Sequence, residues 1–447
     1  MWRNFCRFTS NQQFYNNHRL SKYLDRPTTE LSIQSLCKYG QFLSEKKLFD
    51  MSNFVKDQIS IRLAKRIKDF QALPFVTVSS SHLQDVYDLY WHSFYMFSAV
   101  PKITTMKEHN SFLKVMRSNL RSHLVVIPKL AMGIQQASKT TNPDLLNNFG
   151  HLILRSRISR RVLAQQLLRL DERYQKIATS PNEIYDMSTV DGDIGIVSTK
   201  LNLEETVLEM HASAATILQS HFQELPDIEI DGLENIKMSA IKDHLQYILL
   251  ELLKNSLEST VKWHRQGKLH DWVNKSANIN NSLPPVKVTL VDNEYNTTIR
   301  ISDQGGGIPN AILKHIFDFT KMEIHERLAD FEKIKYLAAT THEQIQGTGI
   351  SGDIPNKTIQ INKDIGLVED LPVHTDKAET LHEIQNRILK EYLVGTPSKI
   401  SSHHAPIHLG LGLPMSRVFL DYWKSTILIN SLDGYGTDVY LIINKVP

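Results

Sequence analysis

The chain has 447 residues, a formal net charge of +3 at pH 7 and 41% hydrophobic residues. These values are those of an ordinary globular protein with enough apolar material for the cores of two domains. Because the charges are dispersed, the composition does not indicate nucleic-acid binding. The two cysteines, Cys6 and Cys37, provide neither a disulfide framework nor a cysteine-built zinc site. No apolar run reaches the length of a membrane span.

The N-terminal segment is basic. Arg3, Arg7, Arg19 and Lys22 precede the first acidic residue, Asp25. This composition is typical of a transit peptide, and we expect such a segment over about residues 1–30. Composition alone leaves an ordinary basic terminus open as the alternative.

Residues 40–180 carry apolar stripes at helical spacing. In the first stripe, Ser52 is predicted to cap a helix that stops at Pro74. Further stripes cover residues 83–97, 112–135 and 145–174, with Pro101, Pro128 and Pro143 between the helical runs. Antiparallel helices with short connections predict a four-helix bundle. Residues 181–226 are predicted to contain a linker and the last helix of the bundle.

Residues 227–447 are predicted to form a second domain, which makes the fold α+β. An acidic strand or turn over residues 226–232 opens it, and β-runs at residues 286–291 and 297–302 come after a helical segment. The last strands form a hairpin over residues 426–443. A long polar stretch over about residues 321–405 has the composition of an inserted loop.

Chemistry is concentrated in the helical segment over residues 244–260. Its leucines and isoleucine recur on one stripe, so Glu251 and Asn255, four residues apart, project together from the opposite side. A carboxylate and an amide one turn apart suit a magnesium-bound nucleotide and an attacking oxygen. A polar face of this kind is usually only solvated, so the pair alone does not establish a site.

Two glycine-rich loops come later in the chain than this helix. Asp303 ends a β-run immediately before the loop that contains Gly305 and Gly307. Later, Gly410 and Gly412 precede a helical run over residues 414–422, whose free backbone N–H groups favour phosphate oxygens. Each loop alone is more often a turn or hinge, but the order of helix and loops predicts a nucleotide site.

This ordered set resembles the Bergerat-type (GHKL, histidine-kinase-like) ATP-binding fold, an α/β sandwich. The segments ELLKNSLEST, DQGGGIP, GLGLPMSRVF and DGYGTDVYL are similar to those of the mitochondrial 2-oxo acid dehydrogenase kinases, with a fungal-type pyruvate dehydrogenase kinase favoured. RLAKRIKDFQALP, HLVVIP and RSRISRRVL also resemble the regulatory helical bundle of that family. The resemblance therefore covers most of the chain after about residue 40.

The resemblance implies ATP and Mg²⁺ as cofactors and assigns roles to particular residues. Glu251 is expected to be the general base, Asn255 the Mg²⁺ ligand and Lys254 a neighbour on the phosphate side. Asp303 is expected to accept a hydrogen bond from the adenine amino group. The other implied nucleotide contacts are Gly305, Gly307 and Ile308 at the first loop, Gly410, Leu411, Gly412 and Leu413 at the second, and Thr437 in the adenine pocket. His123 and Arg157 are candidates for a regulatory carboxylate pocket.

The implied function is that of a serine protein kinase in the mitochondrial matrix. Its substrate would be the pyruvate dehydrogenase E1 alpha subunit, which phosphorylation inactivates, and a homodimer bound to the lipoyl domain of the acyltransferase core is expected. Pro447 lies directly after the last strand, where pyruvate dehydrogenase kinases carry a long tail that helps to hold the lipoyl domain, so the resemblance does not extend to that mode of lipoyl binding.

Other interpretations stay open. Tyr247 stands where pyruvate dehydrogenase kinases typically carry histidine, as in the branched-chain 2-oxo acid dehydrogenase kinase, and His408 occupies a position that is usually glycine. A GHKL ATPase or scaffold, in which Glu251 activates water, is a further alternative. A sensor histidine kinase is disfavoured because no phospho-acceptor motif surrounds His211, His221 or His244.

Overall fold

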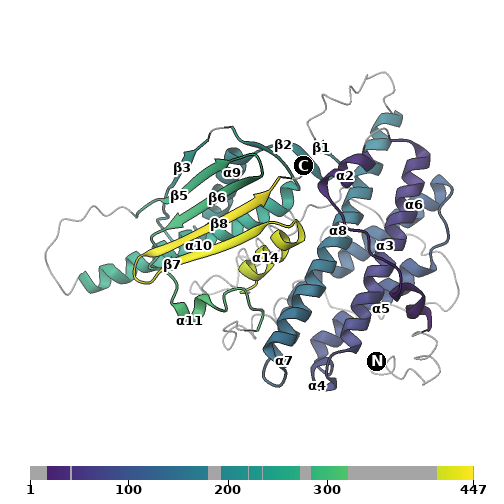
Figure 1. Ribbon diagram of the computed structural model, residues 1–447, viewed down its shortest axis with the longest axis horizontal. Helices are drawn as coiled ribbons and strands as arrows, with labels where there is room; N and C mark the ends of the chain where they lie inside the picture. Colours follow the sequence, from purple (N-terminus) through teal and green to yellow (C-terminus); the bar gives the residue numbers. More distant parts are fainter. Residues whose placement is uncertain are drawn as a thin grey trace, which may run out of the picture.

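The computed structural model describes residues 18–40, 43–179, 193–219, 221–233, 235–271, 283–320 and 410–445. They form a helical bundle and a mixed α/β domain that lie side by side (Figure 1). The predicted α+β class is confirmed. Within these ranges, no helix is long and apolar enough to cross a membrane. The predicted insertion at residues 321–405 and His408 lie outside the described residues.

Long helices with buried apolar stripes build the bundle. They are α3 (Glu45–Gln71), α5 (Ser81–Ala99), α6 (Met106–Ser122), α7 (Val126–Ala137) and α8 (Pro143–Thr179). The short α2 (Ile33–Gly40) precedes α3, α4 (Phe75–Val78) lies between α3 and α5, and η2 (His123–Val125) lies between α6 and α7. Helix α3 packs on α5 and α8, and α5 packs on α7. The stripe predicted over residues 112–135 is thus two helices, separated by η2. Pro128 is accommodated because it lies in the first turn of α7, where a missing N–H breaks no helical bond.

The predicted helix cap at Ser52 was wrong. Helix α3 begins earlier, where the side chain of Ser44 accepts a hydrogen bond from the backbone N–H of Lys47. Ser52 lies inside the helix, fully buried, with its hydroxyl 2.8 Å from Nδ1 of His109. His109 Nε2 is in turn 3.0 Å from Oδ1 of Asp171. The hydroxyl therefore joins a polar chain across the bundle.

Residues 18–30, within the expected transit segment, pack on the bundle. Leu20 is 2% exposed, and the ring of Tyr23 meets that of Phe94 edge-on with centroids 5.3 Å apart. The guanidinium of Arg62 donates a 2.6 Å hydrogen bond to the carbonyl oxygen of Thr29. These contacts make residues 18–30 part of the folded bundle, whereas residues 1–17 lie outside the described ranges.

A five-stranded sheet forms the centre of the second domain, in the order β3-β5-β6-β8-β7. Its strands are β3 (Ile228–Gly232), β5 (Val286–Asp292), β6 (Asn296–Asp303), β7 (Thr426–Leu432) and β8 (Gly436–Asn444). Only β3 and β5 pair in parallel within this sheet. The predicted strands and hairpin are confirmed. Helices α9 (Leu203–Leu218) and α10 (Lys242–Asp271) lie behind the sheet in Figure 1, while α14 (Gly412–Tyr422) packs on α10 and β7. The short α11 (Asn310–Leu313) comes after β6.

The segment predicted as a linker and last bundle helix has a different structure. After the predicted linker come β1 (Asp193–Ile194) and β2 (Val197–Asn202), which pair with β4 (Lys237–Ala240) in a small antiparallel sheet. Helix α9 then packs along α10. Its buried Val207, Met210 and Ala214 make an apolar stripe that the second domain covers. The assignment of this helix to the bundle is therefore corrected.

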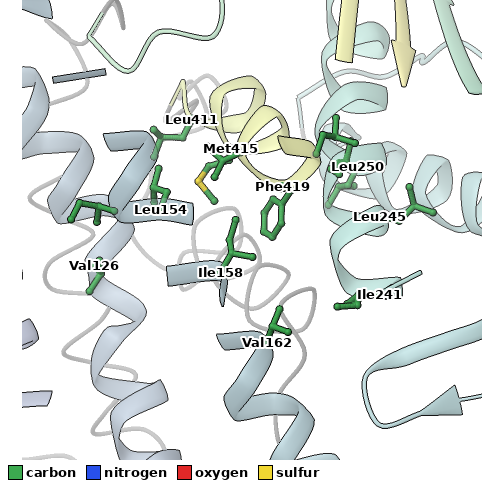
Figure 2. Packing of buried hydrophobic residues seen from close by; sticks show 14 of the residues in the cluster. Val126, Leu154, Ile158, Val162, Ile241, Leu245, Leu250, Leu411, Met415 and Phe419 are labelled. Atoms are coloured by element: carbon green, nitrogen blue, oxygen red, sulfur yellow. The ribbon is translucent and has the colours of Figure 1, made fainter. Parts of the chain in front are cut away.

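Helix α14 joins the two parts of the molecule. It packs against α8 of the bundle and against α10 of the sheet domain. Figure 2 shows its side chains between theirs: Met415 and Phe419 of α14, Leu154, Ile158 and Val162 of α8, and Leu245 and Leu250 of α10. His151 Nε2, 3.2 Å from Oδ2 of Asp421, adds a polar link. The second glycine loop is thereby held at the junction.

Candidate functional site

The carboxylate of Glu251 lies at the junction of α10 and α14. The leucine stripe of α10 is buried, and Glu251 itself is only 9% exposed. Its Oε2 is 2.7 Å from Nζ of Lys254, one turn further along the helix. A Cβ at Gly412 would lie 2.4 Å from the same oxygen, so a larger residue there would displace the Glu251 side chain. Asn255 lies one turn after Glu251 and is partly buried. The predicted base, its cationic neighbour and the second glycine loop are therefore together.

Tyr247 stands one helical turn before Glu251. Its ring packs on Phe419 of α14, with centroids 5.2 Å apart. Burial, reinforced by the nearby Glu251 charge, raises the pKa of Tyr247 well above its ordinary value of 10.0. The side chain is therefore a neutral phenol beside the carboxylate and supplies no positive charge.

Asp303, at the end of β6, is held by three donors. Ser256 Oγ of α10 donates to Oδ2 over 3.0 Å, while the backbone N–H groups of Gly305 and Thr437 donate to Oδ1 over 2.9 and 3.3 Å. Burial raises the pKa of Asp303, against the opposite effect of these hydrogen bonds. Because Oδ2 accepts from Ser256 alone among these donors, it keeps acceptor capacity for a ligand.

The first glycine loop is fixed to the turn between β7 and β8. Gly306 and Gly307 have φ values of +81° and +76°, a region that other residues rarely adopt. The N–H of Gly434 donates to Gly306 O over 2.8 Å, and the N–H of Gly306 donates to Tyr435 O over 3.2 Å. Close packing also explains Gly305, where a Cβ would lie 2.3 Å from Oγ of Ser259.

Ser431 connects this loop to the predicted adenine pocket. Its Oγ accepts a 2.6 Å hydrogen bond from the N–H of Ile308 and lies 3.2 Å from Oγ1 of Thr437. Thr437 in turn pairs with Asp303 across β8 and β6. Ile308, Asp303 and Thr437 are thus brought to one end of the sheet.

The second glycine loop leads directly into α14. Gly410 has a φ of +66°, Leu411 is 5% exposed and Leu413 is partly buried. The predicted helix start after the glycines is confirmed, with Gly412 as its first residue. In the first turn of α14, Pro414 has no N–H and the N–H of Met415 donates to Leu411 O, which leaves the N–H groups of Gly412 and Leu413 as the donors for an anion.

A second, cationic site lies in the bundle. A cavity of about 30 Å³ is lined by His123 and by Arg157, Arg160 and Arg161 of α8. The predicted pair is in contact, because Arg157 Nη2 donates a 3.0 Å hydrogen bond to His123 O. Nε2 of His123 lies 2.6 Å from Oγ of Ser93, which fixes the imidazole ring.

The charges of this cavity are strongly perturbed. Burial, followed by the charge of Arg161, lowers the pKa of Arg157 to about 9, so the guanidinium remains cationic at neutral pH. Burial, followed by the charges of Arg160 and Arg157, lowers the pKa of His123 well below 6.5, so the ring is neutral. Arg157 Nε and Arg160 Nη2 are buried without a hydrogen-bond partner among the described residues. Buried cations with spare donors favour an anion.

Sequence reasoning missed Ser256 and Ser431. Ser256 interrupts the apolar stripe of α10, and a small hydroxyl on a buried stripe is a usable signal because buried hydroxyls need partners. Ser431 carried no signal of its own. Its role depends on its pairing with Thr437 across the β7–β8 hairpin, which brings it to the first glycine loop.

Fold and site together describe an α+β protein with a buried carboxylate close to the second glycine loop and a cationic cavity in the helical bundle. Residues 30–198 match the family model described as mitochondrial branched-chain alpha-ketoacid dehydrogenase kinase. The chain is also 25% identical over 471 residues to [Pyruvate dehydrogenase (acetyl-transferring)] kinase 2, mitochondrial, of Saccharomyces cerevisiae, covering 97% of this chain and 86% of that one.

Two further relatives bear the name [Pyruvate dehydrogenase (acetyl-transferring)] kinase, mitochondrial. The one from Arabidopsis thaliana is 23% identical, over 94% of this chain and 91% of its own length. The one from Schizosaccharomyces pombe is 22% identical, over 94% of both chains. The chain is thus similar over nearly its whole length to mitochondrial pyruvate dehydrogenase kinases, and its N-terminal part matches a family model of mitochondrial 2-oxo acid dehydrogenase kinases.

Proposed function

We propose that the protein is a mitochondrial serine kinase that uses Mg-ATP to phosphorylate, and so inactivate, the E1 component of the pyruvate dehydrogenase complex. The observation that carries the proposal is the buried Glu251 carboxylate, held between Lys254 and the start of α14. A base in this position lies beside the helix N-terminus that would receive phosphate oxygens. The names of the full-length relatives supply the substrate.

The residues present suit a nucleotide of the kind that the GHKL fold binds. Asp303 presents a fixed carboxylate oxygen for the adenine amino group, and Thr437 closes the same end of the sheet. On the phosphate side of the nucleotide, Asn255 offers an amide oxygen to Mg²⁺, which prefers oxygen ligands. Gly412 leaves beside Glu251 a space that any Cβ would fill. When bound, Mg²⁺ would neutralise phosphate charge during transfer.

In the proposed reaction, Glu251 accepts the proton of the substrate serine as the serine oxygen forms a bond to the γ-phosphorus. The bond between that phosphorus and the bridging oxygen to the β-phosphate breaks, and ADP leaves. Lys254 orients the Glu251 carboxylate through its 2.7 Å ion pair and places positive charge on the phosphate side. The neutral Tyr247 packs beside the base without competing for the proton.

We further propose that the bundle cavity binds a small carboxylate that regulates the kinase. Arg157 and Arg160 contribute buried donors, and the neutral His123 limits the total charge. A carboxylate would pair with these guanidinium groups. The family model covers the bundle, which is where the family resemblance places a regulatory pocket.

A branched-chain 2-oxo acid dehydrogenase kinase is the second candidate. Tyr247 beside the base and the description of the matching family model favour it. A GHKL ATPase or scaffold, with Glu251 activating water, is the alternative outside the kinases. We also expect the protein to form a homodimer and to bind the lipoyl domain of the acyltransferase core.

The deciding experiment offers the purified protein labelled ATP with either pyruvate dehydrogenase or branched-chain dehydrogenase, each with and without its acyltransferase core. The proposal predicts label in serine of the pyruvate dehydrogenase E1 alpha subunit, at a higher rate when the core is present. Preferential labelling of the branched-chain enzyme would establish the second candidate. ATP hydrolysis without labelling of either enzyme would establish the ATPase.

A further inference from the structure

Helix α8 of the bundle holds the segment that leaves the first glycine loop. Oδ1 of Asn147 accepts hydrogen bonds from two consecutive backbone N–H groups, 2.8 Å from that of Phe319 and 3.2 Å from that of Thr320. Residues 308–320 connect the first glycine loop to this point. One amide side chain of the bundle thus satisfies two donors of the sheet domain.

The side chain of Phe319 reinforces the same contact. It is 3% exposed and rests over Gly150, where a Cβ would lie 3.1 Å from its ring and 3.0 Å from Cδ1 of Ile134. Because Asn147 and Gly150 are three residues apart on α8, they share one face of the helix. That face offers a hydrogen-bond acceptor and a slot for an aromatic ring side by side.

The second glycine loop rests on the same helix. Leu411 lies beside Leu154 of α8 in Figure 2, and Met415 lies beside Ile158. Helix α8 therefore contacts both flanks of the candidate site: the segment after the first glycine loop and the start of α14, which touches Glu251.

We propose that Asn147 is a positioning residue for the nucleotide site, which makes the bundle helix α8 a structural part of that site. By fixing Phe319 and Thr320, Asn147 restrains the segment after Ile308, and its loss weakens nucleotide binding without removing any nucleotide contact. This inference rests on the proposed ATP site. The docking contact is measured by hydrogen exchange and the ATP site by nucleotide affinity, so the two are tested separately.

The test compares Asn147→Ala and Asn147→Asp with Asn148→Ala. Asn148 is the exposed neighbour on α8 and provides the matched control. Hydrogen exchange is measured at the amides of Phe319 and Thr320, with amides of α5 as an internal reference for global unfolding. Asn147→Ala should speed exchange at the two amides by roughly fivefold, because each loses a hydrogen bond worth about 1 kcal/mol. Asn147→Asp keeps an acceptor and should retain protection.

ATP affinity, measured by calorimetry, gives the second readout. Asn147→Ala should raise the Kd by roughly 5- to 30-fold, within the usual range of coupling between sites, with a matching rise in KM and little change in kcat. Asn147→Asp and Asn148→Ala should stay near the wild-type value. Unchanged exchange at the two amides in Asn147→Ala would overturn the docking contact. Faster exchange with unchanged ATP affinity would reduce Asn147 to a purely structural residue and overturn the proposal. A wild-type protein that binds no ATP would overturn the proposed function, whatever the exchange shows.

Discussion

Gly412 touches the carboxylate of Glu251 so closely that a Cβ in its place would lie 2.4 Å from Oε2. The two residues come from α14 and α10, and the packing of these helices on each other and on α8 sets their separation. The carboxylate of Glu251 is therefore placed by contacts between helices of the protein itself. Preorganisation of this kind is what positions a general base for transfer.

A substitution at this contact should be costly for activity. In Gly412→Ala, the added methyl must displace the Glu251 side chain or tilt α14, and a misplacement of about 1 Å costs roughly 10²-fold in rate. Initial rates of phosphoryl transfer measure the effect, with thermal melting to confirm that the variant is folded. A folded variant with the wild-type rate would show that this contact does not set the position of the base.

Asp303→Asn should weaken ATP binding while the domain stays folded. Asparagine keeps an oxygen for the N–H groups of Gly305 and Thr437 but loses the anionic acceptor for the adenine amino group. Calorimetry with ATP and with GTP, whose base offers no amino group at that position, provides a matched comparison. Asp303→Asn should lower the affinity for ATP more than that for GTP. Unchanged ATP affinity would place the adenine elsewhere.

The pKa of Asp303 also predicts a pH dependence. Burial raises this pKa above the ordinary value of 3.8, so the folded state holds the proton to higher pH than the unfolded state does. Stability therefore falls as pH rises from about 3.8 through the raised pKa, and the full penalty is present above it. Asp303→Asn lacks this penalty, so its stability relative to wild type should improve across that interval. Denaturant titrations at several pH values measure this difference, and a pH-independent difference would contradict the assignment.

The cationic cavity predicts a ligand effect on stability. Pyruvate, as a small carboxylate probe, should raise the Tm of the wild-type protein, because binding to the native state alone stabilises it. Arg157→Met should abolish the shift, since it removes a buried guanidinium of the cavity. Arg155→Met, an exposed arginine of the same helix, is the matched control and should respond like wild type. An equal shift in all three proteins would locate the carboxylate site elsewhere.

The buried polar chain in the bundle predicts a loss of stability. Ser52→Ala leaves Nδ1 of His109 without its 2.8 Å partner inside the bundle, at a cost of about 1–3 kcal/mol. Ser111→Ala provides the control on α6, because its exposed hydroxyl bonds only to its own helix. Urea denaturation of both variants measures the cost. Equal stabilities would mean that water or a rearranged side chain satisfies the imidazole.

Local patterns predicted much of the fold. Helix α10, strands β5 and β6 and the last hairpin arise from periodicity and turn residues that act within a few positions of the chain. The two wrong assignments both concern contacts between residues that are far apart in the sequence. The Ser52 hydroxyl was assigned to a cap because its partner, 57 residues away, does not appear in any local pattern. The helix over Leu203–Leu218 was assigned to the bundle because an apolar stripe predicts that one face of a helix is buried but not which element packs against it.

In the candidate site, too, residues marked by local patterns could be predicted, whereas residues placed by distant contacts could not. Glu251, Asp303 and the glycines were found because helix phase and loop composition mark them in the sequence. Asn147 could not be found, because its contact with Phe319 spans 172 positions and depends on how the bundle meets the sheet domain. Ser431 was hidden for a related reason, since strand pairing brings it to Ile308.

Variants of Asn255 and Glu251 should have different effects, because Asn255 is proposed to bind the metal and Glu251 to accept the proton. Asn255→Ala should impair Mg²⁺-dependent retention of ATP, because it removes the proposed ligand of the metal. Glu251→Gln should instead bind Mg-ATP almost normally, because the side chain keeps its shape and loses only its basic carboxylate. Calorimetry with and without Mg²⁺ distinguishes the two, and a loss of Mg²⁺ dependence in Glu251→Gln would reverse the assignments.

The most direct test of the kinase proposal is the rate at which Glu251→Gln transfers labelled phosphate from ATP to the pyruvate dehydrogenase E1 alpha subunit. With ATP binding confirmed in the same preparation, we expect a rate roughly 10²- to 10⁴-fold below wild type, the usual contribution of general base catalysis. Transfer at the wild-type rate would show that Glu251 is not the base, and a wild-type protein that hydrolysed ATP without labelling the subunit would contradict the proposed function itself.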